Sequence, residues 1–412
     1  MNRVVITGYG VAAPIGNDAD TFLESLQTGK NGIGPITKFD ASETGITLAA
    51  EVKEFPFDKY FVKKDAKRMD LFSLYGIYAA LEAMEMSHLD TEKIDVDRFG
   101  VMLGSGIGGL QSLQDLVIRM HDKGPKRVGP LFIPMAIGNM AAGNIALRVG
   151  ARGICSATVT ACATANNSIG EAFRNIKHGY SDVILAGGAE ASITEIGIAG
   201  FASLTAVTSS EDPNRGSIPF DKDRSGFVMG EGAGILVLES LEHAQKRGAA
   251  ILGEIVGYGS NCDAYHMTSP RPDGSGAAKA MQLAIEEASV EAAAIGYINA
   301  HGTSTPSNDV AETRAIQTAL GKASKNVRVS STKSMTGHSL GATGGIEAIA
   351  TLNALQHQFI PPTINIEQLD EAIEIDNIVI NESQKHTFDY ALTNSFGFGG
   401  HNAVLCLKRW ED

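Results

Sequence analysis

The chain has 412 residues, 43% of them hydrophobic, and a mean hydropathy near zero, which predicts a globular protein with a large core and more than one structural unit. Its formal charge of -13 argues against general nucleic-acid binding and against a basic membrane-binding face. Any basic site must therefore be local.

The first half of the chain alternates short apolar runs with segments of helical periodicity, which is typical of an α/β fold. Strands are predicted at "RVVITG", "FGVMLG", "VILAGG" and "AGILVLE", and helices near 65–86, from near 109, and near 163–178.

After about residue 250 the same alternation begins again. Strands are predicted at "ILGEIVGYGS", "IGYINAHG", "VRVSS", "NIVI" and "NAVLCLK", and helices near 275–288, 308–320 and 344–357. The repetition predicts two similar halves, 1–250 and 251–412. Because no low-complexity linker separates them, they should share one continuous core.

Two features predict a cytoplasmic protein that does not cross a membrane. The N-terminal run "RVVITG" is broken by Thr7 and Gly8, as in a buried strand and unlike a signal peptide. The most apolar long stretch, 183–207, contains Glu190, Glu195 and several glycines, which excludes a membrane span.

Cys162 is the candidate nucleophile. The other cysteines are Cys155, Cys262 and Cys406, and the spacing of the four fits neither a zinc-binding CxxC pair nor a disulfide framework, so reduced thiols are expected. Cys162 lies between the β-prone run "SATVTA" and the helix predicted near 163–178. A helix N-terminus favours a thiolate, so we expect its pKa to lie below the usual ~8.5.

Two histidines are candidate acid-base partners for this nucleophile. His301 ends the run "IGYINAH", and His338 lies in "TKSMTGHSLGATGG" with Lys333 five residues earlier. Both lie beside glycines in loops that follow predicted strands. Together they make a stronger case for a site than either histidine would alone.

Two glycine-rich motifs suggest other functions. "GYGVAA" and "GSGIGG" match the dinucleotide-binding fingerprint, but the acidic strand end expected about twenty residues later is missing. We therefore expect these glycines to allow close packing or to line a pocket.

"GHSLG" matches the nucleophile elbow of serine hydrolases, with Asp376 and His386 or His401 downstream in the required order. The strand that should run straight into this elbow is absent, because "VRVSS" already ends at Ser331. A serine hydrolase or thioesterase that uses Ser339 remains the alternative interpretation.

Six ordered motifs spread over the chain, together with the Cys-His-His set, resemble the elongating β-ketoacyl-[acyl-carrier-protein] synthases. They are "VVITGYG", "TACAT", "PFDKDRSGFVMGEGAG", "NAHGTSTPSND", "TKSMTGHSLGATGG" and "NSFGFGGHN". The resemblance implies a thiolase-like α/β fold in which two similar halves form a five-layered α-β-α-β-α core. It implies an acyltransferase that condenses malonyl units with an acyl chain in fatty acid biosynthesis. A non-catalytic acyl-carrier-binding homologue is the other alternative.

The same resemblance implies roles for individual residues. Cys162 would carry the acyl chain, and His301 and His338 would promote decarboxylation of the malonyl group. The backbone N–H groups of Cys162 and Phe398 would form an oxyanion hole, and Lys333 would keep the site positive. The remaining implied site residues are Glu347 and Asp309 as acidic partners of Lys333, Thr303 and Thr305 on the phosphopantetheine arm, and Ile107 and Phe201 in the acyl pocket.

The resemblance also implies partners. No redox cofactor or catalytic metal is needed, because the substrates arrive on the phosphopantetheine of an acyl carrier protein. A local positive patch would steer this acidic partner, and its candidate residues are Lys64, Lys67, Arg68, Lys126 and Arg127. A homodimer is expected, with Phe132 at its interface. A cation site resembling that of relatives, at Asn299, Glu347, Asn394 and Ser395, is left open, as is the effect of His401, where relatives carry threonine.

Overall fold

A computed structural model describes residues 1–411. Its main strands are β1 (Val4–Ala12), β4 (Phe99–Gly104), β5 (Cys155–Ser156), β6 (Val183–Glu190), β7 (Gly232–Ser240), β8 (Gly253–Cys262), β9 (Ile295–Asn299), β10 (Arg328–Ser330), β13 (Tyr390–Gly397) and β14 (His401–Arg409). Two short pairs lie outside the main sheet, β2 (Gly34–Pro35) with β3 (Leu48–Ala49) and β11 (Phe359–Ile360) with β12 (Gln384–Lys385).

The helices are α1 (Ala19–Thr28), α2 (Leu71–Ser87), α3 (Leu110–Lys123), α4 (Phe132–Ala136), α5 (Met140–Val149), α6 (Thr164–Lys177), α7 (Glu195–Ser203), α8 (Leu241–Arg247), α9 (Ser275–Ala288), α10 (Pro306–Leu320), α11 (Lys333–Thr336) and α12 (Thr343–His357). Short 3-10 helices are η1 (Phe57–Lys59), η2 (Val96–Arg98), η3 (Pro125–Arg127), η4 (Ala161–Ala163), η5 (Ala292–Ala294), η6 (Gly321–Lys325) and η7 (Leu340–Ala342).

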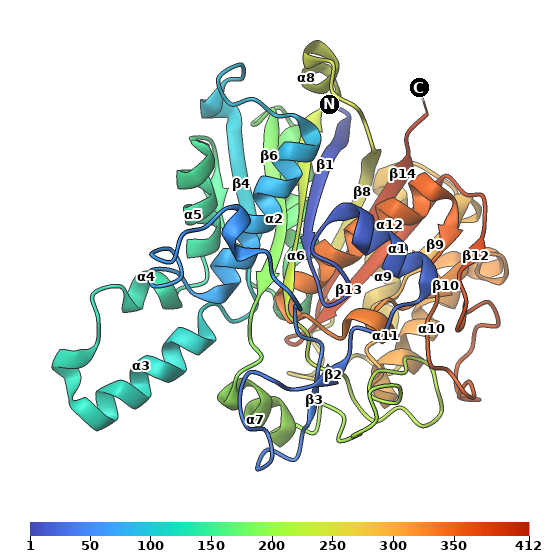
Figure 1. Cartoon of the computed structure of the whole chain (residues 1–412). Coiled ribbons are helices and arrows are strands. Elements are labelled where there is room, and N and C mark those ends of the chain that lie inside the picture. The colour runs from blue at the N-terminus through green and yellow to red at the C-terminus, as the bar shows by residue number, and fades with distance from the viewer. Residues whose placement is uncertain (412) are drawn as a thin grey trace.

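The ten main strands form one sheet in the order β10-β9-β13-β14-β8-β1-β7-β6-β4-β5 (Figure 1). The order is the same in both halves: β5-β4-β6-β7-β1 in the first and β10-β9-β13-β14-β8 in the second. In each half the first two pairings are parallel and the last two antiparallel. The halves join where β1 pairs with β8 over Val4–Ile6. Two similar α/β halves were predicted, and this fold class is confirmed. The exact boundary at residue 250 remains a prediction.

The helices complete the layers. α2 packs on β1 and β7, α5 packs on β4, and α9 packs on β8 with α10 beside it. α6 and α12 contact each other and strands of both halves, so they form the central layer. α12 is buried at every position from Thr343 to Leu355, as expected of a helix in a central layer. Among the described residues, no helix combines the length and hydrophobicity needed to cross a membrane.

The predicted helix near 65–86 begins later, at Leu71. Asp70 lies in extended backbone and accepts a hydrogen bond from the Phe72 N–H, so it caps the helix. The predicted strand "NIVI" is wrong, because Ile378 and Ile380 form only isolated bridges. The strand before β14 is instead β13, which the sequence pattern missed since it buries polar residues in mid-strand.

The glycines of "GYGVAA" and "GSGIGG" allow close packing, as predicted. A Cβ at Gly10 would overlap the Ala79 carbonyl of α2, and one at Gly104 would overlap the Thr158 carbonyl. Both motifs are therefore explained by contacts within the protein.

Candidate active site

Cys162 lies in η4, immediately before α6. The preceding Ala161 has a φ of +50°, a conformation that is unfavourable for a residue with a side chain. The predicted strand before the nucleophile is reduced to Cys155–Ser156, and an irregular segment leads from there into the turn. The turn places the thiol in a buried position that is 8% exposed.

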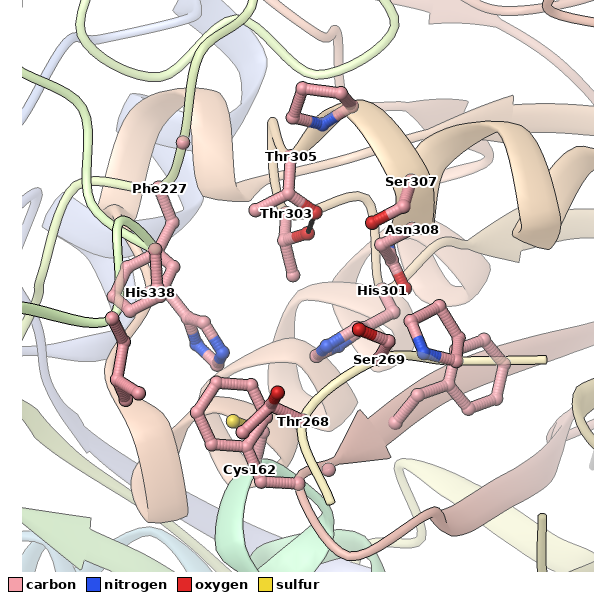
Figure 2. A pocket seen from close by; sticks show the side chains of 18 of the residues that line it. Cys162, Phe227, Thr268, Ser269, His301, Thr303, Thr305, Ser307, Asn308 and His338 are labelled. Atoms are coloured by element: carbon pink, nitrogen blue, oxygen red, sulfur yellow. Dashed lines mark hydrogen bonds between the residues drawn. The ribbon is translucent and has the colours of Figure 1, made fainter. Parts of the chain in front are cut away.

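The thiol lies at one end of a cavity of about 290 Å³. Figure 2 shows His301 and His338 pointing into the same space, with Thr303 and Thr305 farther from the sulfur. The lining also includes Phe201, Phe227, Thr268, Ser269, Ser307, Asn308 and Phe398. The structure thus brings together residues from both halves of the chain that the sequence had singled out.

The expected lowering of the Cys162 pKa is wrong for the free protein. The pKa of this thiol is raised to about 12, mainly by burial and to a smaller extent by the Glu190 carboxylate. Lys333 and the backbone N–H groups of Phe398 and Cys162 act in the opposite direction. Loss of water outweighs the helix N-terminus, so the resting group is a thiol. Both N–H groups nevertheless act on the sulfur, where an oxyanion hole for its acyl ester would lie.

The two histidines are buried and neutral. Their ring centroids lie 5.3 Å apart with an interplanar angle of 86°. Burial holds the pKa of both well below the usual value, and Lys333 lowers both further. His338 Nδ1 lies 3.0 Å from Thr343 Oγ1, and its ring packs edge-on against Phe227. A neutral imidazole can donate one hydrogen bond or accept a proton, and both abilities suit acyl chemistry.

Lys333 and Glu347 form a buried ion pair with a 2.6 Å Nζ–Oε1 distance and side chains 1% and 0% exposed. Burial raises the Glu347 pKa to about 7, although Lys333 opposes this. Glu347 is thus placed beside Lys333 as predicted.

Asp309, in contrast, is not placed beside Lys333. Its carboxylate accepts a hydrogen bond from the Phe220 N–H and lies 3.5 Å from Arg224. That part of the prediction is wrong, because the turn at residues 303–306 directs α10 so that Asp309 meets the "PFDKDR" segment.

Glu312 is a site residue that the sequence reasoning missed. Its carboxylate accepts hydrogen bonds from the backbone N–H groups of His301 and Gly302 at 2.8 and 2.7 Å, and from Asn394 Nδ2 at 3.0 Å. It therefore fixes the loop that carries His301. Helical spacing could have found it, because Glu312 lies on one face of α10 between Asp309 and the buried Ile316.

Of the remaining predicted site residues, three line the cavity and one does not. The Thr303 and Thr305 hydroxyls lie 2.8 Å apart in the cavity wall. Phe201 packs against Phe398, with ring centroids 6.4 Å apart, and both line the cavity. Ile107 does not join them: it is 42% exposed on the face that carries α3. The prediction of Ile107 as pocket lining is thus not met within a single chain.

The predicted docking residues are all exposed. Lys64, Lys67 and Arg68 lie on the turn before α2, and Lys126 and Arg127 lie in η3. The structure therefore leaves these side chains available to a partner.

Several buried oxygens lie on β13, on its neighbour β9 and on α12, which packs on β13. Within residues 1–411, five of these atoms find no hydrogen-bond partner: Asn299 Oδ1, Glu347 Oε2, Thr393 Oγ1, Asn394 Oδ1 and Ser395 Oγ. Buried polar atoms without partners are costly, and oxygen donors of this kind suit a hard cation. The residues left open in the sequence analysis therefore fit such an ion.

Ser339 lacks the surroundings of a hydrolase nucleophile. Its hydroxyl is buried and lies 3.4 Å from the Glu231 carbonyl, to which it donates. Of the two possible histidine partners, His386 stacks on Phe388 and His401 begins β14. The structure gives no support to the serine hydrolase.

The site combines a buried thiol, two main-chain N–H groups and two neutral imidazoles, and the fold is a duplicated α/β fold. These features define an enzyme that transfers acyl groups through a thioester. Two family models cover most of the chain: "Beta-ketoacyl synthase, N-terminal domain" matches residues 1–244, and "Beta-ketoacyl synthase, C-terminal domain" matches residues 252–367. The chain belongs to the beta-ketoacyl synthase family.

Curated relatives include the 3-oxoacyl-[acyl-carrier-protein] synthase 2 of Synechocystis sp., 50% identical over 99% of this chain and 98% of the relative. The enzyme of the same name from Staphylococcus aureus strain COL is 50% identical over 99% of both chains. Among solved structures, a beta-ketoacyl synthase from Burkholderia phymatum matches with a TM-score of 0.92, 35% identity and full coverage of both chains. A type II polyketide ketosynthase in complex with its acyl-carrier protein matches with a TM-score of 0.92, 32% identity and full coverage of both.

Proposed function

We propose that this protein elongates fatty acyl chains by two carbons, through decarboxylative condensation of a malonyl group carried on acyl carrier protein with an acyl group carried on Cys162. The observation that carries the proposal is that one cavity holds two separate sets of hydrogen-bond donors. Backbone N–H groups of Cys162 and Phe398 act on the sulfur, while His301 and His338 enter the same cavity. The 50% identity to two 3-oxoacyl-[acyl-carrier-protein] synthases supports it.

In the first half-reaction, the Cys162 sulfur attacks the thioester carbonyl of the acyl-carrier substrate. A new S–C bond forms, the carrier thiolate leaves, and it takes up the proton that Cys162 loses. Because the resting thiol is protonated, a base must act during attack, and the neutral imidazoles in the cavity can relay the proton. The two backbone N–H groups stabilise the tetrahedral oxyanion.

In the second half-reaction, the carboxylate of the malonyl group leaves as CO2, and the electron pair of the broken C–C bond becomes an enolate. Neutral His301 and His338 donate N–H groups to the enolate oxygen. The enolate carbon attacks the acyl-cysteine carbonyl, and the Cys162 thiolate leaves and is reprotonated. Lys333 keeps the imidazoles neutral and the field positive. Thr303 and Thr305 line the wall where the phosphopantetheine arm would enter.

We further propose that no redox cofactor or catalytic metal takes part, and that the reaction occurs in the cytoplasm. A monovalent cation held by Asn299, Glu347, Asn394 and Ser395 would be coordinated by oxygens that find no hydrogen-bond partner. It would act through Glu347, the partner of Lys333, without touching substrate.

Acyl carrier protein is the proposed partner, and Lys64, Lys67, Arg68, Lys126 and Arg127 form the proposed docking patch. Their exposure and positive charge favour an acidic partner. Charge reversal in Lys67→Glu/Arg68→Glu should raise KM for acyl-carrier substrate at unchanged kcat. An unchanged KM would remove the patch from the proposal.

A homodimer is the proposed assembly. α3, α4 and α5 carry adjoining exposed apolar side chains, among them Val117 at 48%, Ile133 at 58% and Leu147 at 81%. A surface of this kind marks an interface. Ile107 and Phe132 lie on the same face, so both would be covered by a second copy.

The deciding experiment is acyl-adduct mapping. After incubation with an acyl-carrier thioester, intact mass and peptide mapping should place one acyl group on Cys162, and malonyl-carrier should then remove it with formation of a product two carbons longer. Cys155→Ala, which removes an exposed thiol, should react normally, and Cys162→Ala should not react. An adduct on Ser339, or release of free acid with Cys162 unmodified, would contradict the proposal.

A further inference from the structure

Glu190 is a buried carboxylate for which the reaction described above has no use. It ends β6 and is 0% exposed. Its Oε1 accepts hydrogen bonds from the Ser105 and Ser192 hydroxyls at 3.0 and 2.9 Å. Its Oε2 accepts the backbone N–H groups of Gly106 and Gly341 at 2.7 and 3.1 Å. One side chain thereby ties together the loop after β4, the end of β6 and η7.

The contact with Gly341 leads to His338. Gly341 lies in η7, which runs directly into α12, and the first residue of α12 is Thr343. The Thr343 hydroxyl lies 3.0 Å from His338 Nδ1. A change at Glu190 therefore reaches the ring through two short links, Gly341 and Thr343. The His338 backbone is held separately, through the Val228 carbonyl.

The internal duplication relates the Gly341–Glu190 contact to the position of Cys162 in the first half. In the first half, Ala161 with φ +50° begins η4, and α6 starts at Thr164. In the second half, Leu340 with φ +46° begins η7, and α12 starts at Thr343. Gly341 is thus the counterpart of Cys162. The backbone N–H of Cys162 acts on the reacting sulfur, whereas that of Gly341 is bound by the Glu190 carboxylate.

The carboxylate therefore occupies, in the second half, the anion position that the first half keeps free for substrate. The glycines are part of this arrangement, because a Cβ at Gly341 would overlap the Gly106 N–H and come within 2.8 Å of Glu190 Oε2. This contact accounts for one glycine of "GSGIGG" and the last glycine of "GHSLG", motifs that the reaction itself does not explain.

We propose that Glu190 is a positioning residue for the decarboxylation half-reaction. It holds η7 and Thr343 in place, so that the His338 ring faces the malonyl thioester. The inference rests on the proposed function. It predicts that the two half-reactions respond differently to loss of Glu190, because the oxyanion hole at Cys162 is built from other segments, η4 and the β13–β14 turn. Its charge also acts on Cys162, whose thiol pKa it raises.

The test compares Glu190→Gln, Glu190→Asp and the wild-type protein. An amide keeps the length of the side chain, but its single neutral oxygen accepts the N–H groups of Gly106 and Gly341 more weakly than a carboxylate does, so the hold on Gly341 is loosened. Malonyl-carrier decarboxylation by Glu190→Gln should fall about 100-fold, the cost of a misplaced catalytic group. Acylation of Cys162 by acyl-carrier should be retained. Glu190→Asp keeps the charge on a shorter side chain, so its decarboxylation rate should lie between those of Glu190→Gln and the wild-type protein.

The rate of Cys162 alkylation by iodoacetamide at pH 8 supplies a second readout, because it is proportional to the small thiolate fraction. The rate should rise in Glu190→Gln and stay unchanged in Glu190→Asp, because only the first variant removes the anion. Glu239→Gln is the matched control: Glu239 is equally buried but binds Thr7, His243 and Arg247. The folded Glu239→Gln protein should keep both half-reactions and the wild-type alkylation rate.

Equal loss of both half-reactions in Glu190→Gln, an unchanged alkylation rate, or failure of both Glu190 variants to fold would overturn the proposal. If the wild-type protein neither decarboxylates malonyl-carrier nor acylates Cys162, the proposed function fails instead. The alkylation rate still tests Glu190 in that case.

Discussion

The buried neutral histidines should make the protein sensitive to acid, and removing them should relieve that sensitivity. Burial holds the pKa of His301 and His338 well below 6.5 in the folded protein. The unfolded chain regains ordinary imidazoles, so below pH 6.5 it binds protons that the folded protein cannot. Stability therefore falls as pH drops through this value. The double variant His301→Asn/His338→Asn lacks both proton-binding groups.

The size of the effect follows from linkage. At pH 5.5, one unit below the unfolded pKa, each histidine favours the unfolded chain by about 1.4 kcal/mol relative to neutral pH, or about 2.8 kcal/mol for the pair. With an unfolding entropy of about 2.1 cal/mol/K per residue, this corresponds to a shift in Tm of about 3 °C. The Tm of the double variant relative to wild type should rise by that amount between pH 7.5 and pH 5.5.

Thermal unfolding at both pH values and one scan rate measures this difference. Comparison with wild type at each pH removes the contribution of every carboxylate common to both proteins. His121→Asn replaces an exposed side chain of α3 and should show no such change. If the Tm difference between double variant and wild type is the same at both pH values, the histidines are protonated in the folded protein and the reasoning fails.

Three further predictions follow from the site and the surface. Lys333→Met should lower the free energy of unfolding by about 3 kcal/mol at pH 8, where Glu347 is ionised. The loss should be smaller at pH 6, because the Glu347 pKa is about 7. Equal losses in urea unfolding at both pH values would contradict this. Potassium chloride should raise Tm above that in choline chloride at equal ionic strength, and Asn394→Ala should abolish the difference. Equal Tm values of the wild-type protein in the two salts would contradict the ion site. Ile133→Asp should convert a dimer to a monomer in light scattering, and a monomeric wild type would refute the assembly.

The sequence alone determined the repeated α/β pattern and the candidate residues of the site. α9 runs from Ser275 to Ala288, as its periodicity predicted, because the signal is local. Cys162, His301 and His338 could be singled out since each follows a strand-like run, and strand ends meet at one edge of a sheet.

Only the tertiary structure decided the partners and the charges of these groups. Asp309 and Glu312 lie on the same helix face, and whether either meets the His301 loop or Arg224 depends on how α10 packs after the turn at 303–306. The Cys162 pKa depends on how much water the whole fold removes from it, so the helix N-terminus gave the wrong direction. The contacts of Glu190 were equally hidden, because its hydrogen-bond donors lie up to 151 residues from it in the chain. Chain-local patterns set spacing, whereas burial and contacts between distant segments set electrostatics.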